Sequence, residues 1–454
     1  MDRYKSRRFG FIKFRGRELD TGYMDKTPVL QFVLVSLLFP MWGAAASLND
    51  ILITQFKTIF NLSNFASAYV QSAFFLGYFI MAIPASYLIK RTSYKFTIVV
   101  GLILYLVGSS LFFPASAAAT YGFFLVALFV LATGLSLIET SADTFSALLG
   151  QEKGRTLRLN ISQTFLPIGS IAGILLGKYL IFTNGDNLET QLKGLSGSVK
   201  IAFGEKALRK TLLPYRYMII ALIVMIVIFL IVQFPKSKPA ITTKKSQENI
   251  GQTVVSLLKN KDFCYGMFTE FMYVGLQVSV WSFTIRLALT LNNSLNERNA
   301  SNFVIYSYIA FFVGRVIADY LMRTIPHLKV LLTYSVLGFI AIAYMLIDRS
   351  FNGVYVAILV SGLMGPGYAT IYTETLSFIK NPHHTETAGA MIVMMVIGGA
   401  FWPLAQGWLA DLTGSMSLSF AVHLLTFGAM AIFSYHYIKH PVKSQLLGAS
   451  ENVD

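Results

Sequence analysis

Two carboxylates in apolar stretches of the sequence have the setting of proton-carrying groups. Asp50 lies at the end of an apolar run in "SLNDILITQF", and Glu139 lies in "LIETSADTF". A charge at membrane depth costs roughly 2.5–3.5 kcal/mol even on the lenient insertion scale. A carboxyl shielded from water is easier to keep protonated, and one exposed alternately to the two sides of a membrane can carry a proton. Asp50 and Glu139 are the predicted proton-coupling residues. The alternative is a structural hydrogen bond or ion pair, with Lys178 or Arg286 as partner.

Asp143 follows Glu139 by four residues, so the two side chains share one helical face. Two adjacent carboxylates in a low dielectric should not both ionise. Either they share a proton, or Asp143 lies nearer the inner surface and is solvated. The basic turn "QEKGRTLR" follows closely, and it favours a solvated Asp143.

Amide and aromatic side chains recur in the apolar stretches and indicate a ligand. Amides offer paired donors and acceptors to hydroxyl groups, and aromatic faces cover the apolar surface of a sugar ring. The alternative for each residue is a core position with its hydrogen bonds satisfied. Together with Glu139, the predicted substrate-binding residues are Trp42, Asn49, Gln71, Gln163, Tyr273, Gln277 and Trp281.

Other ionisable residues in these stretches suggest gating or leave the role open. Arg315 and Asp319, with Arg323, have the spacing of a gating ion pair, for which a structural role is an equal alternative. The roles of Lys178 and Glu270 stay open. No cluster of His, Cys, Asp or Glu has the spacing of a metal site, so we expect no metal. There is no "GxxxxGK[ST]" loop and no catalytic constellation. We therefore expect no enzyme and no cofactor, with the proton as coupling ion.

Composition shows what must hold these residues. The 454 residues are 55% hydrophobic and only 13% charged, whereas soluble domains carry about 25% charged residues. The sequence predicts an all-α membrane protein in a lipid bilayer, and the net charge of +15 is spread in a way that does not indicate nucleic acid. Apolar runs of about 20 residues fit a bilayer core. The twelve predicted transmembrane helices are 28–56, 65–89, 95–114, 120–148, 159–182, 215–234, 263–290, 302–322, 329–347, 353–379, 387–409 and 417–437.

A polar linker divides the chain into two sets of six spans. The predicted parts are a basic N-terminal tail (1–27), an N-terminal half (28–234), a linker (235–261), a C-terminal half (262–437) and a C-terminal tail (438–454). Lys and Arg concentrate in the N-terminal tail and the linker, which predicts that both termini are cytoplasmic. The outside loop 183–214 breaks this trend.

Short repeats relate the two halves. "FFLG" (74–77) recurs as "FFVG" (311–314), and "GSIAGILLG" (169–177) has the terminal glycine spacing of "GAFWPLAQG" (399–407). Both matches fall in equivalent spans, which favours a duplicated six-span unit, although matches this short could arise by chance. Two six-span halves around a site at the membrane midplane are typical of a secondary transporter. We expect Gly101 and Gly108 to permit close helix packing.

Several motifs resemble a known family. "SLNDILITQF", "YVQSAFFLGYFI", "IETSADTF", "LRLNISQTF", "YVGLQVSVWSFTIR" and "FFVGR" together resemble the L-fucose–proton symporter family of the major facilitator superfamily. The resemblance covers about 30–435. It implies the superfamily fold of two six-helix halves, in which Asp50 is protonated with the change of state and Glu139 couples the proton to the sugar. Gln163 matches a sugar-lining glutamine, and Asn49 falls in the same "LND" motif.

Departures from that family leave the sugar open. This chain has Ser47 and Asp143 where the fucose carriers have asparagine, and Glu270 where they have glutamine, while Lys178 is extra. Relatives in the family carry glucose, galactose or N-acetylglucosamine. We therefore expect a monosaccharide–proton symporter of the cytoplasmic membrane that acts as a monomer, with L-fucose favoured and another hexose or amino sugar as the alternative.

Two alternatives of other classes remain. A drug–proton exporter is disfavoured by the amide-rich candidates and by the absence of the usual antiporter motif after span four. A membrane sensor of sugar would usually add a long soluble signalling domain, and the predicted tails are short.

Overall fold

The computed structural model describes residues 11–60, 64–181, 192, 195–237, 250–292, 294–295, 297–379 and 381–441. Within these ranges, twelve helical segments are long and apolar enough to cross a membrane. The regular structure of the described residues is helical, and two isolated β-bridges are the extended pairings found there. The prediction of an all-α membrane protein with twelve spans is confirmed.

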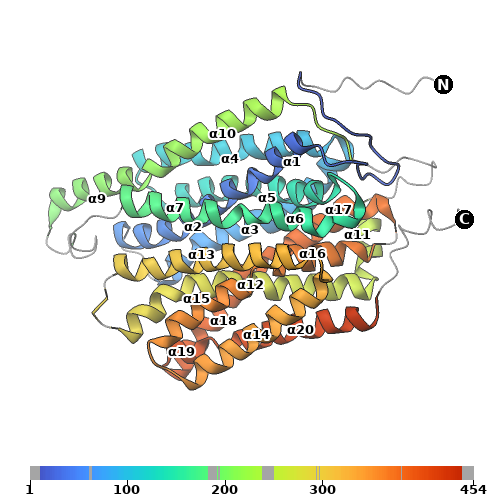
Figure 1. Cartoon of the computed structure of the whole chain (residues 1–454). Coiled ribbons are helices and arrows are strands. Elements are labelled where there is room, and N and C mark those ends of the chain that lie inside the picture. The colour runs from blue at the N-terminus through green and yellow to red at the C-terminus, as the bar shows by residue number, and fades with distance from the viewer. Residues whose placement is uncertain are drawn as a thin grey trace, which may run out of the picture.

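The helices form two groups that Figure 1 shows one above the other. The first group comprises α1 (Val29–Ser36), α2 (Leu38–Ile59), α3 (Asn64–Arg91), α4 (Tyr94–Ala117), α5 (Tyr121–Leu148), α6 (Arg155–Thr164), α7 (Leu166–Leu180), α9 (Gly197–Thr211) and α10 (Leu213–Ile231). The second comprises α12 (Lys261–Leu291), α13 (Glu297–Leu321), α14 (His327–Ile347), α15 (Asn352–Leu363), α16 (Gly367–Ser377), α17 (Thr385–Val393), α18 (Gly398–Thr413), α19 (Met416–Ser419) and α20 (Val422–Lys439).

The same helix pairs recur in the two groups, which is what a duplicated unit requires. In the first half α2 packs along α7, and α5 packs along α3 and α4. In the second half α12 packs along α18, and α15 packs along α13 and α14. The halves meet along two seams, where α3 contacts α17 and where α6 and α7 contact α13. A site between the halves is therefore flanked by helices of both.

Glycines let the helices of the first half approach closely. A Cβ on Gly134 of α5 would lie 2.5 Å from the backbone nitrogen of Tyr105 and 2.6 Å from the carbonyl oxygen of Gly101, both on α4. Gly108 of α4 faces the backbone of Leu131 in the same way. A side chain at these glycines would push the two helices apart, so the predicted packing role of Gly101 and Gly108 is confirmed.

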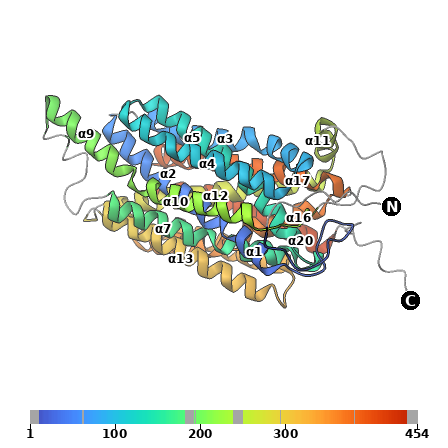
Figure 2. The same ribbon diagram turned by 90° about the horizontal axis from the view of Figure 1, so that it is seen from above.

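Two helices lie where the sequence predicts loops. Residues Gly197–Thr211 form α9 inside the predicted outside loop 183–214, and Ile250–Leu258 form α11 inside the predicted linker. With α10, α9 makes a helical segment of 35 residues, or about 50 Å, which exceeds a bilayer core of about 30 Å. In Figures 1 and 2, α9 projects beyond the bundle. Its charged residues hide it from a search for apolar spans.

The described part of the N-terminal tail lies against the bundle. The Phe11 amide donates to the Ile231 carbonyl (2.6 Å), and the Met24 amide donates to the Gly150 carbonyl (3.2 Å). We call residues 11–27 the N-terminal strap. The terminal end of the bundle is the end at which this strap, α11 and the last turn of α20 lie (Figure 1). Residues 1–10 are outside the described ranges.

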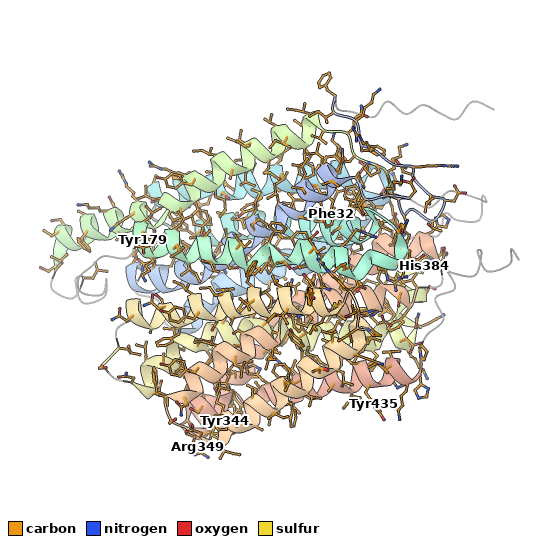
Figure 3. All side chains as sticks on the ribbon, viewed as in Figure 1. Phe32, Tyr179, Tyr344, Arg349, His384 and Tyr435 are labelled. Carbon is orange, nitrogen blue, oxygen red and sulfur yellow. The ribbon has the colours of Figure 1, made fainter. Side chains whose placement is uncertain are left out.

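The outer surface carries apolar side chains, as contact with lipid requires. Exposed side chains include Val224, Ile340, Leu359 and Ile432, from helices of both halves. Figure 3 shows Tyr179 and Tyr344 toward one end of the bundle and Tyr435 toward the terminal end, and all three are exposed. Tyrosine favours the membrane–water interfaces, so these residues mark the two levels between which the bundle crosses the bilayer.

Three spans are interrupted beside the centre of the molecule. Span five breaks at Phe165, between α6 and α7, and span ten breaks between α15 and α16 at Pro366. Span eleven passes through the 3₁₀ turn η4 (Met394–Ile397) between α17 and α18. Irregular backbone at membrane depth is tolerated where it is buried in protein or lines a cavity. Each break has a cavity-lining residue within two positions or inside the turn.

Candidate functional site

A cavity lies between the halves, with an empty volume of about 780 Å³ that includes its opening to solvent. Residues of α2, α3, α5, α6 and α7 line it from the first half, and residues of α12, α13, α16 and η4 line it from the second. The predicted residues on its wall are Trp42, Asn49, Glu139, Gln163, Gln277 and Trp281.

Of the other three predicted residues, the structure describes the side chain of Tyr273 alone. Tyr273 directly precedes the lining residue Val274 on α12 but is not itself on the wall. Its hydroxyl donates to the Met364 carbonyl (2.8 Å) and accepts from Gln277 Nε2 (3.5 Å). Gln71 lies in α3 and Asp50 in α2, but both side chains are outside the described residues. The predicted roles of Asp50 and Gln71 remain predictions.

Three buried polar atoms on the cavity wall have no hydrogen-bond partner. They are Oδ1 of Asn49, Oε2 of Glu139 and Nε1 of Trp281. A buried polar group without a partner costs about 1–3 kcal/mol. The set contains an amide acceptor, an indole donor and a carboxyl, so a ligand with several hydroxyl groups would satisfy all three.

Aromatic rings supply the apolar part of the wall. The Trp281 ring lies 4.3 Å from the Tyr308 ring, centroid to centroid, and meets Phe311 edge-on at 5.2 Å. On the facing half, Trp42 donates its indole N–H to the Tyr78 hydroxyl, and this bond holds the ring against the cavity. Rings fixed in this way present flat apolar faces at little entropic cost.

Glu139 and Asp143 of α5 are joined across the halves by Tyr368 of α16. The Tyr368 hydroxyl lies 3.1 Å from Glu139 Oε1 and 2.8 Å from Asp143 Oδ2. A phenol has one hydrogen to donate, so only one of these two contacts can use it. The other contact requires a proton on a carboxyl. Glu139 and Asp143 therefore share one proton, in addition to the hydrogen of the phenol itself.

Asp143 is the ionised member of this set by its contacts. It also accepts from Gln163 Nε2 (2.9 Å), so each of its oxygens has a donor. Glu139 has one unpartnered oxygen, which suits a protonated acid that donates to Tyr368. The expected solvation of Asp143 is wrong: its side chain is 0% exposed, because α16 covers the turn of α5 that the sequence suggested was open.

The expected alternative partners of Glu139 are engaged elsewhere. Lys178 Nζ donates to Asn302 Oδ1 (2.7 Å), which joins α7 to α13. The Arg286 guanidinium lies over the Phe283 ring of its own helix, 5.1 Å from the centroid. Among the described residues, neither forms an ion pair with Glu139 within 4.0 Å.

The predicted gating group is arranged differently from an ion pair. Asp319 Oδ2 accepts from Thr164 Oγ1 (3.0 Å), and this bond joins α13 to α6 across the halves. Arg315 is buried and donates from Nε to the Gly365 carbonyl (2.6 Å), while Arg323 is exposed. Neither arginine lies within 4.0 Å of Asp319 as an ion pair in the described residues. Asp319 therefore joins the halves through a hydroxyl, and the predicted pairing is wrong.

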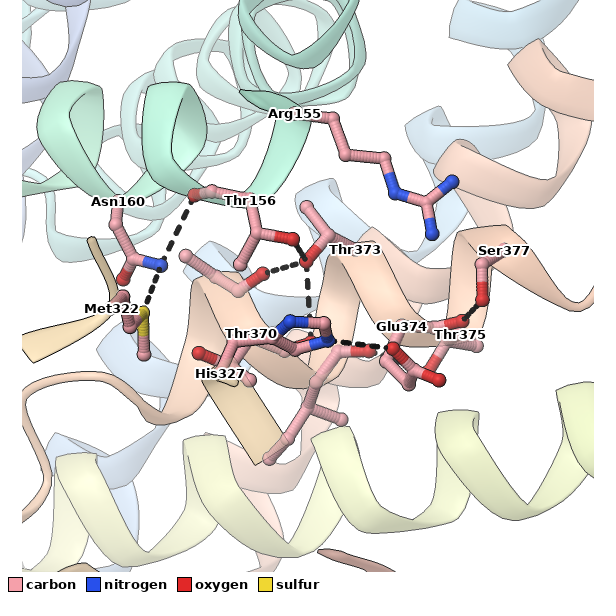
Figure 4. A network of polar contacts seen from close by, with 12 residues as sticks. Arg155, Thr156, Asn160, Met322, His327, Thr370, Thr373, Glu374, Thr375 and Ser377 are labelled. Atoms are coloured by element: carbon pink, nitrogen blue, oxygen red, sulfur yellow. Dashed lines mark hydrogen bonds and ion pairs between the residues drawn. The ribbon is translucent and has the colours of Figure 1, made fainter. Parts of the chain in front are cut away.

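Hydroxyl groups close the terminal end beyond the cavity. One turn past Tyr368, the Tyr372 hydroxyl bonds to Thr144 (2.8 Å). Thr156 bonds to Thr373 (3.0 Å), as Figure 4 shows, and Ser86 bonds to Thr387 (3.4 Å). Figure 4 also shows His327 and Glu374, which contact at 2.8 Å within the second half. Weak bonds between neutral groups can break and re-form as the halves move.

Tyr368 is the main residue that the sequence analysis missed. It follows the interruption at Pro366 in "GPGYATIYTET", a stretch whose density of Tyr and Thr is high for a span. That density was the available signal. Pairing with α5 depends on tertiary contact, which no spacing in the chain reports.

Among the described residues, no group of three or more His, Cys, Asp or Glu could hold a metal ion.

Comparisons with known proteins identify the family. The model of the Major Facilitator Superfamily matches residues 32–388. The chain belongs to the major facilitator superfamily. It is 32% identical to the L-fucose-proton symporter of Escherichia coli K12 over 93% of this chain and 96% of that protein. It is also 32% identical to the glucose/galactose transporter of Brucella abortus, over 88% and 92%. The chain is thus a multi-pass membrane transporter and not an enzyme.

Solved structures agree with this family. The transporter FucP in the outward conformation matches with a TM-score of 0.80 at 30% identity, over 90% of this chain and 98% of that one. A D-xylose-proton symporter matches with a TM-score of 0.62 at 12% identity, over 89% and 96%, and that likeness concerns the fold alone. The resemblance read from the motifs is confirmed at the level of family and fold.

Proposed function

We propose that the protein is a secondary active transporter that carries one monosaccharide with protons across the cytoplasmic membrane. L-fucose is the favoured substrate. One observation carries the proposal. The cavity between the halves has aromatic walls and unpartnered polar atoms, and its Glu139 is bonded through Tyr368 to the other half. Relatives named as L-fucose-proton symporters support both the sugar and the proton.

Coupling follows from the shared proton. When Glu139 is protonated, it and Tyr368 can hydrogen-bond while Asp143 stays ionised. When that proton leaves, Tyr368 can donate to only one of two carboxylates, and these repel each other. A sugar hydroxyl that hydrogen-bonds to Glu139 Oε2 stabilises the protonated and the ionised forms of Glu139 to different extents. Sugar binding and protonation of Glu139 are therefore linked.

Orientation completes the proposal. With both termini in the cytoplasm, the terminal end faces inward, and the cross-half hydroxyl bonds close it to the cytoplasm. The likeness to FucP in the outward conformation supports this orientation of the cavity. Transport then requires separation at the terminal end and closure at the opposite end, and a monomer contains every group in this scheme.

Another hexose or an amino sugar is the second candidate. Relatives named as glucose/galactose transporters cover most of the chain. The cavity has an acidic wall at Glu139, with Asp143 directly behind it.

Uptake into proteoliposomes tests the proposal. Labelled L-fucose is offered under an inward proton gradient, with galactose, glucose and N-acetylglucosamine as competitors and a protonophore as control. Accumulation that the protonophore abolishes supports symport. Accumulation of a competitor in place of L-fucose identifies the second candidate. Sugar movement that ignores the proton gradient contradicts coupling.

A further inference from the structure

Glu270 of α12 is a buried carboxyl that the cavity scheme leaves unused. Its side chain is 0% exposed, and neither of its oxygens has a hydrogen-bond partner. An ionised carboxylate buried without partners is far costlier than a neutral acid. Glu270 is therefore uncharged in this conformation and holds a proton of its own.

Helix geometry relates Glu270 to the cavity. Glu270, Val274, Gln277 and Trp281 are spaced by four, three and four residues, so they form one stripe along α12. Val274, Gln277 and Trp281 line the cavity. Glu270 continues the same stripe one turn further toward the terminal end, directly below the cavity floor.

The charges around Glu270 independently indicate that it holds a proton. Glu270 interacts electrostatically with Glu139 and Asp143 of α5 and with Arg315 of α13. Tyr273, Tyr368 and Tyr372 are the phenols that interact with it. Arg315 is 1% exposed and also interacts with Asp319, which in turn interacts with the exposed Arg323. Among the described residues, this cluster thus contains four carboxyls and two guanidiniums. Two guanidiniums balance at most two carboxylates, so neutrality requires at least two protons.

The two protons are held by different groups. One belongs to the set of Glu139, Tyr368 and Asp143, where a single phenol hydrogen serves two carboxyl contacts. Asp143 receives two donors and is the ionised member, and Asp319 accepts from Thr164, whereas neither oxygen of Glu270 has a partner, so the second proton belongs to Glu270.

We propose that Glu270 is a second proton-binding site of the transporter, loaded in this conformation and emptied when the terminal ends of the halves separate. This rests on the proposed sugar–proton symport. On release, the O–H bond of the acid breaks, the proton passes to water, and the carboxylate remains. Water that enters between α5 and α16, once the bond of Thr144 to Tyr372 is broken, solvates that carboxylate.

Infrared spectroscopy of the purified protein tests the proton on Glu270 without any sugar. At neutral pH, Glu270→Gln is expected to lose a carbonyl stretch of a protonated carboxylic acid relative to the unaltered protein. Glu374→Gln is the matched control, because Glu374 contacts His327 and lies outside the cluster. Loss of only an ionised carboxylate band in Glu270→Gln overturns the proposal.

Flux reversal in proteoliposomes tests transport of the second proton. With the membrane potential clamped to zero, each coupled proton multiplies the sugar gradient that balances one pH unit by about tenfold. Net flux of labelled L-fucose is expected to reverse at a gradient about tenfold larger for the unaltered protein than for Glu270→Gln. Equal reversal points for the two proteins overturn the proposal.

Further variants separate this result from loss of fold and from failure of the proposed function. Glu270→Asp keeps a carboxyl and is expected to reverse near the unaltered protein, while sugar exchange at equal pH reports that each variant is folded. If no sugar moves in the unaltered protein, the proposed function fails. The infrared result then decides whether Glu270 holds a proton.

Discussion

The two halves share a helix arrangement but contribute different chemistry to the cavity. The first half supplies two carboxyls on one face of α5, Glu139 on the cavity wall and Asp143 behind it. The second half supplies the phenol of Tyr368 and the buried guanidinium of Arg315. Glu270 is the exception, a carboxyl on the donor side. The two halves thus share the helix arrangement of a duplicated unit. A few side chains differ between them, so each half contributes different groups to the proton-dependent contact.

The largest expected effect comes from removing the proton site of the first half. Glu139→Gln keeps the shape of the side chain but cannot gain or lose a proton. We expect sugar accumulation under a proton gradient to fall to the equilibrium level while sugar exchange persists, because Glu139 is the proton site on the cavity wall and a proton on Glu270 alone is not linked to sugar binding. Counterflow and gradient-driven uptake in the same vesicles measure both. Glu205→Gln, at an exposed position on α9, is the control, and unchanged accumulation in Glu139→Gln would exclude the coupling role.

Removing the matching group of the second half should have a smaller effect. Tyr368→Phe keeps the ring but leaves two carboxyls without their phenol, which costs roughly 1–3 kcal/mol. We expect gradient-driven uptake to fall by roughly tenfold to 100-fold. Tyr355→Phe changes an exposed tyrosine of α15 and should leave the initial rate intact. A normal rate in Tyr368→Phe would show that the halves are not coupled through this phenol.

The sugar contacts sharpen the comparison at the cavity wall. Asn49→Ala removes an acceptor that has no partner within the protein, so the fold loses little. One hydrogen bond to a ligand is worth about 0.5–1.5 kcal/mol, so we expect sugar affinity to fall by roughly twofold to tenfold. Binding to detergent-solubilised protein measures this, and unaltered affinity would mean that the sugar lies elsewhere.

The smallest expected effect concerns the contact between the halves at the terminal end. Thr156→Val removes the hydroxyl that bonds to Thr373, worth about 0.5–1.5 kcal/mol. The population separated at the terminal end should rise by a few fold. Spin labels at Lys153→Cys and Thr324→Cys, in a Cys264→Ser background, report that separation as a distance distribution. An unchanged distribution would mean that other contacts hold the end shut.

Sequence reasoning succeeded where hydropathy or the chemistry of one side chain decides. The spans could be predicted from the length of the apolar runs. Trp42, Asn49 and Trp281 could be predicted to line a cavity, because a polar group within a span requires a hydrogen-bonding partner. It failed where the outcome depends on the partner helix. The burial of Asp143 comes from α16, and Asp319 meets Thr164 instead of an arginine. The helix α9 was not predicted, because its charged residues interrupt the apolar pattern although the backbone is helical.

The N-terminal strap has a consequence for how the chain matures. The Lys236 amide donates to the Glu18 carboxylate, 218 residues away in the sequence (3.1 Å), and the strap pairs with Ile231 at the end of α10. During synthesis the strap emerges first, but these partners emerge only after the sixth span. The strap therefore cannot dock until the first six spans have been made, so its native contacts require a complete first half.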